Sequence, residues 1–123
     1  MKHKAIAVSI AIVVMLCCSL TAFAGSDYSS GTYNGQAYGT TDRCTTHEFY
    51  SETGSTSDYL LRVSGTAYFS ATAGGPLKSL TFQSGASKKS ASVGNTDSSI
   101  FYNHITSEHF VNGSSVRTVT VYA

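Results

Sequence analysis

The clearest hydrophobic pattern in the chain lies in residues 59–71, YLLRVSGTAYFSA, where apolar and polar side chains alternate. The odd positions are mostly apolar, and the even positions after Leu60 are mostly polar. A period of two is typical of a β-strand that has one face on a core and the other face in water. Gly65 interrupts the apolar positions, which indicates a bulge or a close approach of neighbouring groups. We predict one long strand here, covered by a second sheet or by the remainder of its own sheet.

Turn residues divide the rest of the chain into shorter strand-like segments. Ala73-Gly74-Gly75-Pro76 is the clearest breaker, and Asn112-Gly113 is the strongest hairpin signal. We also expect a turn at Asp42-Arg43 and a flexible start at Gly25–Ser30. The remaining strands are expected at residues 32–41, 44–53, 77–84, 99–111 and 116–122, with an edge strand near residues 89–93.

Six or seven strands joined by short turns predict an all-β fold, an antiparallel β-sandwich. The composition agrees with this fold class, because the chain is rich in Ser, Thr and Tyr and has a single proline. The predicted strand at residues 44–53 has two faces that are about equally apolar, so the pattern leaves open which face is buried.

The N-terminal segment predicts export. A short basic start is followed by an apolar run, residues 5–20, and by small residues at Ala22 and Ala24. This order is typical of a secretory signal peptide, which we assign to residues 1–24, and residues 25–123 then form a single domain. An uncleaved anchor is disfavoured by the A-x-A end, and a lipoprotein by the bulky Leu16 before Cys17. We expect a secreted, extracellular protein without a stable membrane anchor.

Removal of residues 1–24 changes the charge and cysteine content. Six basic and seven acidic residues remain, so the net charge is −1 and favours neither nucleic acid nor an anionic membrane. Cys44 is then the only cysteine, which excludes an intramolecular disulfide. It is either buried, free or part of an intermolecular link, and burial is the default for an unpaired cysteine. The low cysteine content favours a bacterial source.

The sequence contains no pattern that indicates catalysis, a cofactor or a metal. A nucleophile elbow, G-x-S-x-G, is absent, and the carboxylates are scattered along the chain. His104 and His109 are five residues apart on a predicted strand, so they point to opposite faces. Cys44 and His47 are likewise expected on opposite faces. We therefore expect no catalytic, cofactor-binding or metal-ligating residues.

The eight tyrosines are too numerous for one small core. Tyr38 and Tyr68 occupy the polar positions of their predicted strands and are expected to face solvent. An exposed tyrosine offers a flat apolar ring with a hydrogen-bonding tip, which suits stacking on a sugar ring or contact with a protein. The alternative is that these rings only cover the sheet as cross-strand pairs. We take Tyr38 and Tyr68 as the candidate binding surface.

The run SSIFYNHITSEHFVNGSS, residues 98–115, resembles the tyrosine- and histidine-rich strand of the lactococcin 972-like bacteriocins. These are small exported β-sandwich proteins of Gram-positive bacteria. Residues 106–111 also resemble a pattern in uncharacterised Ser/Thr-rich secreted proteins of Firmicutes. The match covers under a fifth of residues 25–123, and the chain departs from the bacteriocins by lacking tryptophan. The resemblance implies a toxin that blocks cell-wall synthesis by engaging a lipid-linked precursor.

Two functions follow as expectations. The first is a secreted, non-enzymatic protein that binds a polymer or a protein partner at or outside the cell envelope. The alternative is a secreted antibacterial protein of the lactococcin 972-like kind. A hydrolase with an unrecognised site is a third and weaker hypothesis. The pattern does not specify the oligomeric state.

Overall fold

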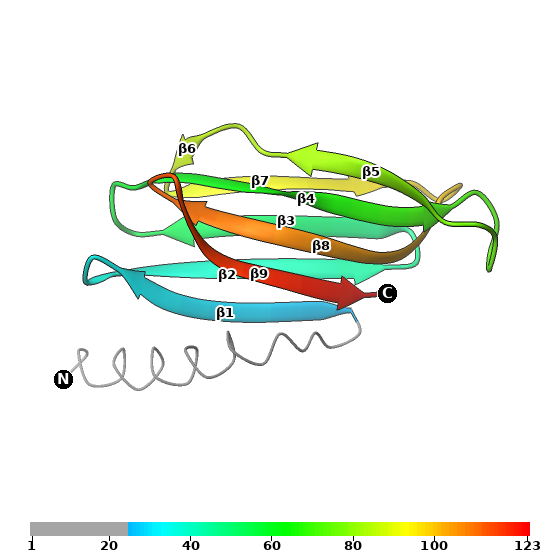
Figure 1. Ribbon diagram of the computed structural model, residues 1–123, viewed down its shortest axis with the longest axis horizontal. Coiled ribbons are helices and arrows are strands. Elements are labelled where there is room, and N and C mark those ends of the chain that lie inside the picture. The colour runs from blue at the N-terminus through cyan, green and yellow to red at the C-terminus, as the bar shows by residue number, and fades with distance from the viewer. Residues whose placement is uncertain (1–24) are drawn as a thin grey trace.

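Strands joined by tight turns make up most of the chain in the computed structural model, which describes residues 25–123 (Figure 1). The predicted signal peptide, residues 1–24, lies outside the described residues. Residues 25–123 contain no helix, and therefore none that is long and apolar enough to cross a membrane.

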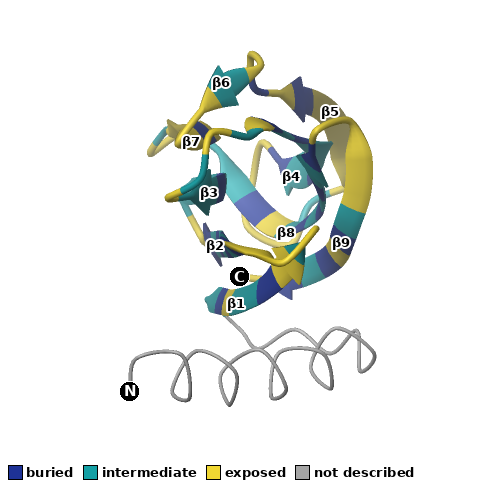
Figure 2. Cartoon of the chain, turned by 90° about the vertical axis from the view of Figure 1, so that its left-hand side faces the viewer, coloured by how far each residue is buried: buried dark blue, intermediate teal, exposed yellow. Residues whose placement is uncertain are grey.

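The strands form two antiparallel sheets that face each other, as Figure 2 shows from the end of the molecule. Sheet A has the order β1-β2-β3-β7 and consists of β1 (Ser26–Tyr33), β2 (Gln36–Thr45), β3 (Glu48–Ser55) and β7 (Ser90–Thr96). Sheet B has the order β5-β4-β8-β9 and consists of β4 (Leu60–Ser70), β5 (Lys78–Gln83), β8 (Phe101–Val111) and β9 (Ser114–Tyr122), with β6 (Ser87–Lys88) paired to β4. The predicted all-β antiparallel sandwich without a disulfide is confirmed for residues 25–123.

Two Asn-Gly pairs form the tightest turns. Asn112 and Gly113 have φ angles of 49° and 82°, and they join β8 to β9 as the sequence predicted. Asn34 and Gly35 have φ angles of 50° and 79° and join β1 to β2. Positive φ at both central residues is typical of a type I′ hairpin turn. The prediction of one continuous strand over residues 32–41 is therefore wrong.

Three other local predictions, for segments on either side of residues 32–41, are wrong. The flexible start expected at Gly25–Ser30 is instead part of a strand, because β1 begins at Ser26 and pairs with β2 from there on. Asp42 and Arg43 do not form a turn but lie inside β2. Residues 44–53 do not form one strand either, because β2 ends at Thr45, a turn follows, and β3 begins at Glu48. The turn also explains why no single face of the segment was apolar. Phe49, Ser51 and Thr53 of β3 point into the interior.

The interior contains two apolar clusters at different places along the strands. The larger cluster has Phe49 at its centre, whose ring contacts Phe82 and Tyr102 with centroid distances of 4.9 and 5.3 Å. Cys44 belongs to this cluster and is buried, as expected for an unpaired cysteine. The smaller cluster consists of Tyr38, Leu61, Ala91 and Val111.

A buried polar network joins the two sheets. His109 of β8 places Nε2 2.7 Å from Asp42 Oδ2 and Nδ1 2.8 Å from Thr53 Oγ1. The side chains of His109 and Asp42 are both 0% exposed. Ser51 Oγ donates a hydrogen bond to the Asp42 carboxylate and lies 2.6 Å from Ser107 Oγ. The network therefore connects β2 and β3 of sheet A to β8 of sheet B.

The buried network satisfies both ring nitrogens of His109. A hydroxyl has one hydrogen, and Thr53 uses it on the carbonyl oxygen of Arg62 at 3.1 Å. Nδ1 of His109 lies within hydrogen-bond distance of the same Thr53 hydroxyl, and the Asp42 carboxylate accepts a hydrogen bond from Nε2. Both ring nitrogens of His109 therefore have a hydrogen-bond partner inside the sandwich.

A second buried ion pair lies at the edge where the two sheets meet. Arg117 Nη2 of β9 contacts Asp27 Oδ2 of β1, and the two side chains are 4% and 10% exposed. The backbone N–H of Gly25 donates to the carbonyl oxygen of Tyr122 at 2.7 Å on the same edge. These contacts link β1 to β9, which lie side by side in Figures 1 and 2.

Gly65 marks a close approach, as the sequence predicted. A Cβ atom at this position would lie 2.1 Å from the Thr106 carbonyl oxygen and 2.6 Å from Cζ of Phe82. The Phe82 ring therefore occupies the space that a side chain at Gly65 would need. The β-bulge between β4 and β8 lies elsewhere, between Tyr68 and Phe69.

We expect Gly65→Ala to lower the free energy of unfolding by about 1–3 kcal/mol, the usual cost of overfilling a packed core. Urea denaturation followed by circular dichroism measures this change. Gly39→Ala is the matched control, because the nearest atom to its new Cβ would be Ser29 O at an ordinary 3.6 Å. A loss of stability as large in the control would contradict the packing role of Gly65.

We expect Asp42→Ala to lower the free energy of unfolding by about 3–5 kcal/mol, because it leaves His109 buried without its partner. Glu48→Ala is the control. It removes a half-exposed ion pair with Arg43, in which the nitrogen and oxygen are 3.2 Å apart, and should cost about 1 kcal/mol or less. The same urea experiment applies, and a small effect of Asp42→Ala would show that the buried pair does not stabilise the sandwich.

Candidate functional site

The two tyrosines predicted to form one surface lie on different sheets and different faces. Tyr68 lies on the outer face of sheet B, next to the buried Ala67. Tyr38 is 8% exposed and belongs to the smaller apolar cluster, so the prediction that it faces solvent is wrong. The Asn34-Gly35 turn determines the register of β2 and directs Tyr38 inward. Its ring then covers Gly31 on β1.

Tyr68 is part of a row of three rings, which we call the ring ladder: Tyr68 of β4, His104 of β8 and Tyr122 of β9. Tyr68 pairs with His104 and His104 pairs with Tyr122 in the strand register. The Tyr68 and His104 rings stack with centroids 4.3 Å apart and an interplanar angle of 14°. The His104 and Tyr122 rings are 5.1 Å apart at 33°. Sequence reasoning identified Tyr68 alone, because the other two rings are brought to it by strand pairing.

A row of threonines lies beside the ring ladder on the same face. The register places Thr81, Thr66, Thr106 and Thr120 in line across β5, β4, β8 and β9. Two of these hydroxyl oxygens, on Thr106 and Thr120, are 3.0 Å apart. The outer face of sheet B therefore offers ring surfaces next to an ordered row of hydroxyl groups. Alternation in each strand would have predicted single threonines here but not their alignment.

The imidazole of His104 in the ring ladder favours its neutral form. Desolvation lowers the pKa of His104 below its ordinary value of 6.5. Its Nδ1 lies 2.7 Å from the side-chain oxygen of Asn103. Two phenol groups and a neutral imidazole are thus present, and each supplies hydrogen-bonding atoms as well as an aromatic ring.

The opposite end of this face carries charged groups. Arg62 of β4 lies over the Phe110 ring, with its guanidinium carbon 4.6 Å from the ring centroid. Glu108 of β8 shares the outer face and pairs with Ser64. The face therefore changes in character along β4, from aromatic at Tyr68 through hydroxyl-bearing to charged at Arg62.

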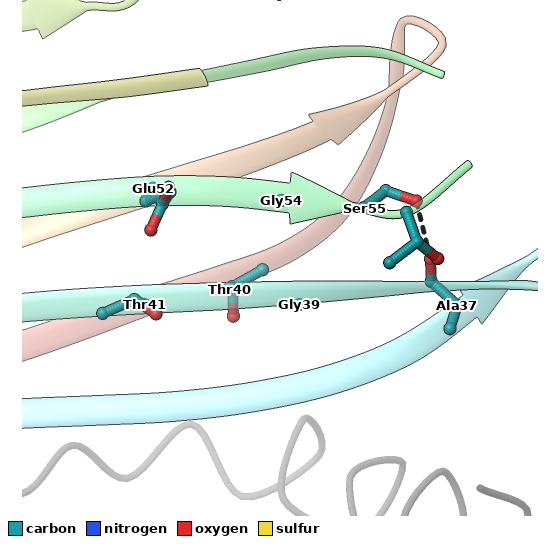
Figure 3. Close-up of a pocket in the computed structure, with 8 residues that line it drawn as sticks. Ala37, Gly39, Thr40, Thr41, Glu52, Gly54 and Ser55 are labelled. Carbon is teal, nitrogen blue, oxygen red and sulfur yellow. Dashed lines mark hydrogen bonds between the residues drawn. The ribbon is translucent and has the colours of Figure 1, made fainter. Parts of the chain in front are cut away.

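The outer face of sheet A has a trough of about 410 Å³ between β2 and β3 (Figure 3). Gly39 and Gly54 face each other in the register and form its floor. An added Cβ at either position would meet its nearest atom at 3.6 Å, so local packing does not require glycine. Glu52 lines the trough, and its carboxylate accepts a hydrogen bond from Ser90. No aromatic ring lines this trough, which makes the outer face of sheet B the better candidate for a ring-shaped ligand.

The histidines of residues 25–123 do not converge on a common site. His109 is buried, His104 belongs to the ring ladder, and His47 has Nδ1 2.7 Å from the Ile100 carbonyl oxygen. No three His, Cys, Asp or Glu side chains are grouped as metal ligands in the described part of the chain. Burial raises the pKa of the Cys44 thiol to about 11, which keeps it in the unreactive thiol form.

The buried network contains serine, histidine and aspartate, the residue types of a hydrolytic triad. Its geometry differs from that of a triad. Ser51 donates to the carboxylate of Asp42, and Ser107 contacts Ser51, so neither serine contacts the imidazole in this network. These side chains are buried, and the network as it stands is inaccessible to a substrate.

Comparisons with known proteins give no relative: no family model, no curated protein and no solved structure matches this chain. The outer face of sheet B, with its ring ladder and threonine row, is thus the basis for a functional proposal.

The lowered pKa of His104 predicts a pH dependence of stability. Just below about pH 6.5 an unfolded histidine gains a proton, while His104 in the folded state stays neutral. The unfolded state then binds more protons, so the free energy of unfolding decreases as the pH falls through this range. An NMR titration of His104 should give a midpoint below 6.5.

His104→Phe is the matched variant, since it keeps a ring in the ladder but has no titrating group. It should lose less stability than the wild type between about pH 7 and about pH 5. A His104 midpoint at or above the ordinary histidine value would contradict the sheltered position of this ring.

Proposed function

We propose that this protein is exported and binds a polysaccharide of the bacterial cell envelope, without catalysing a reaction. The binding surface is the outer face of sheet B. The observation that carries the proposal is the ring ladder, in which Tyr68, His104 and Tyr122 lie in register on three neighbouring strands. The signal-peptide pattern of residues 1–24 supports the part of the proposal that concerns export.

The chemistry of the face suits a sugar polymer. A tyrosine ring provides apolar area for the C–H groups of a sugar, and its hydroxyl provides a hydrogen bond. His104 is the middle ring of the ladder and has a tyrosine ring on each side, whereas Tyr122 lies on the edge strand β9 and is 52% exposed. The row of threonines beside the ladder supplies further hydroxyl groups for the polar edges of the sugars.

The size of the face also suits an extended ligand. Neighbouring strands are about 4.8 Å apart, so three rings on three strands span about 10 Å. A surface without a deep cavity is suited to a chain that lies along it, and less to a small molecule that must be enclosed. A polysaccharide chain meets this description.

The test is retention on insoluble cell walls. Residues 25–123, which contain every strand of the sandwich, are mixed with purified peptidoglycan sacculi and pelleted, and the bound fraction is measured. The double variant Tyr68→Ala and Tyr122→Ala should lose about tenfold or more in affinity, since a loss of 1.4 kcal/mol of stacking is tenfold. Circular dichroism establishes that the variant is folded.

Tyr28→Ala is the matched control. Tyr28 is 64% exposed and lies on the other sheet, in β1, so its removal should leave retention unchanged. Full retention of the folded double variant, or an equal loss in the Tyr28 variant, would show that the outer face of sheet B is not the binding surface.

A further inference from the structure

The three arginines of residues 25–123 differ in how their charge is balanced. Arg43 pairs with Glu48 on the outer face of sheet A, with nitrogen and oxygen 3.2 Å apart. Arg117 pairs with Asp27 in the interior. No ion pair within this part of the chain includes Arg62. Arg62 is therefore the arginine whose charge is available to a partner outside the described residues.

The guanidinium of Arg62 is held in a defined position. Its carbon lies 4.6 Å from the centroid of the Phe110 ring, on the neighbouring strand β8. Its Nε is buried and has no hydrogen-bond partner, which is unfavourable for an N–H group. A hollow of about 90 Å³ lies beside the side chain and is lined by Leu60, Leu61, Arg62, Ala86, Phe110 and Gly113. The group is thus ordered and incompletely hydrogen-bonded.

We propose that Arg62 binds an oxyanion, a carboxylate or a phosphate, of the polysaccharide that lies on the outer face of sheet B, so that the ligand is an anionic glycan. This inference rests on the function proposed for that face. A guanidinium presents a planar fork of N–H donors that matches a carboxylate or a phosphate with two parallel hydrogen bonds. The Phe110 ring lies against one side of the guanidinium, and no ion pair within residues 25–123 uses its N–H donors.

The position of Arg62 relative to the ring ladder suits a polymer. Arg62 and Tyr68 are on the same face of β4, six residues apart, which is about 20 Å along a strand. Ser64 and Thr66 lie between them on this face. A glycan chain lying along β4 would contact rings at one end, hydroxyl groups in the middle and the guanidinium at the other end.

Glu108 acts against an anionic ligand. It shares the outer face and pairs with Ser64, which is two residues along β4 from Arg62. No ion pair joins Glu108 to Arg62. A carboxylate at this distance from the site repels an oxyanion through the surrounding water. Removing its charge should therefore strengthen binding, whereas removing the charge of Arg62 should weaken it.

The experiment compares soluble polymers in affinity electrophoresis at low salt: a polygalacturonate that carries carboxylates, a glycerol phosphate polymer, and neutral dextran. Wild-type residues 25–123 should bind one of the charged polymers at least about tenfold more tightly than dextran. The polymer that binds identifies the oxyanion. Arg62→Gln should abolish the preference for charged polymers, and Glu108→Gln should increase the affinity for them several-fold.

Arg43→Gln is the matched control. Arg43 also lies over an aromatic ring, with its guanidinium carbon 5.3 Å from the Tyr50 centroid, but it already has Glu48 as a partner. This variant should bind as the wild type does. Equal binding of dextran and both charged polymers, or an unchanged preference in Arg62→Gln, would overturn the inference while leaving the polysaccharide proposal intact.

A second readout separates the two proposals if no polymer is retained. The NMR signal of the Arg62 Nε–H group is followed during titration with galacturonate monomer and with inorganic phosphate. A shift that saturates and that is stronger in Glu108→Gln would support the anion site, and only the proposed polysaccharide function would fail. An Arg62 signal that does not respond to either anion would overturn the inference.

Discussion

The buried contact between Asp42 and His109 is the interaction on which the arrangement of the two sheets depends. It crosses the interior from β2 to β8 and lies between the two apolar clusters. Apolar side chains pack in many relative positions, but a buried carboxylate and imidazole need each other at hydrogen-bond distance. We infer that the pair selects one alignment of sheet A on sheet B, because any shift would leave two unpaired polar groups inside.

The same contact has a consequence for the outside of the molecule. Since side chains alternate along a strand, His109 and Ser107 facing inward place Glu108 and Thr106 on the outer face of β8. Strand pairing then aligns Thr106 with the threonines of the neighbouring strands, and His104 with Tyr68 and Tyr122. The burial of His109 on the inner side of β8 thus determines which residues of β8 lie on the candidate binding face.

Charge is distributed differently inside and outside the sandwich. In the interior, Asp42 faces His109 and Asp27 faces Arg117, so each buried acid has a basic partner. An unpaired charge there would be costly, which explains the strict pairing. Arg62 lies on the outer face of sheet B and is only partly buried, so the cost of its charge is smaller there than in the interior. An unpaired cation is therefore tolerated at the surface, where it is also accessible to a ligand.

The sequence by itself determined the features that depend on neighbours along the chain. The alternation around Gly65 predicted the long strand β4, and the Asn112-Gly113 pair predicted the hairpin of β8 and β9. Burial was the expectation for the unpaired Cys44. Only the tertiary structure decided where polar residues lie. Asp42 suggested a turn because its partner, His109, is 67 residues away and is invisible to any local pattern.

The candidate site shows the same division. Tyr68 was found on its outer face by alternation within one strand, whereas Tyr38 was assigned to the wrong face because the turn before it was missed. The ring ladder needs His104 and Tyr122 from two other strands, and their alignment depends on the register between the strands. A period of two is a property of a single segment, whereas the register is set by contacts between segments that are distant in sequence. The outer face of sheet B could therefore be recognised only in the folded chain.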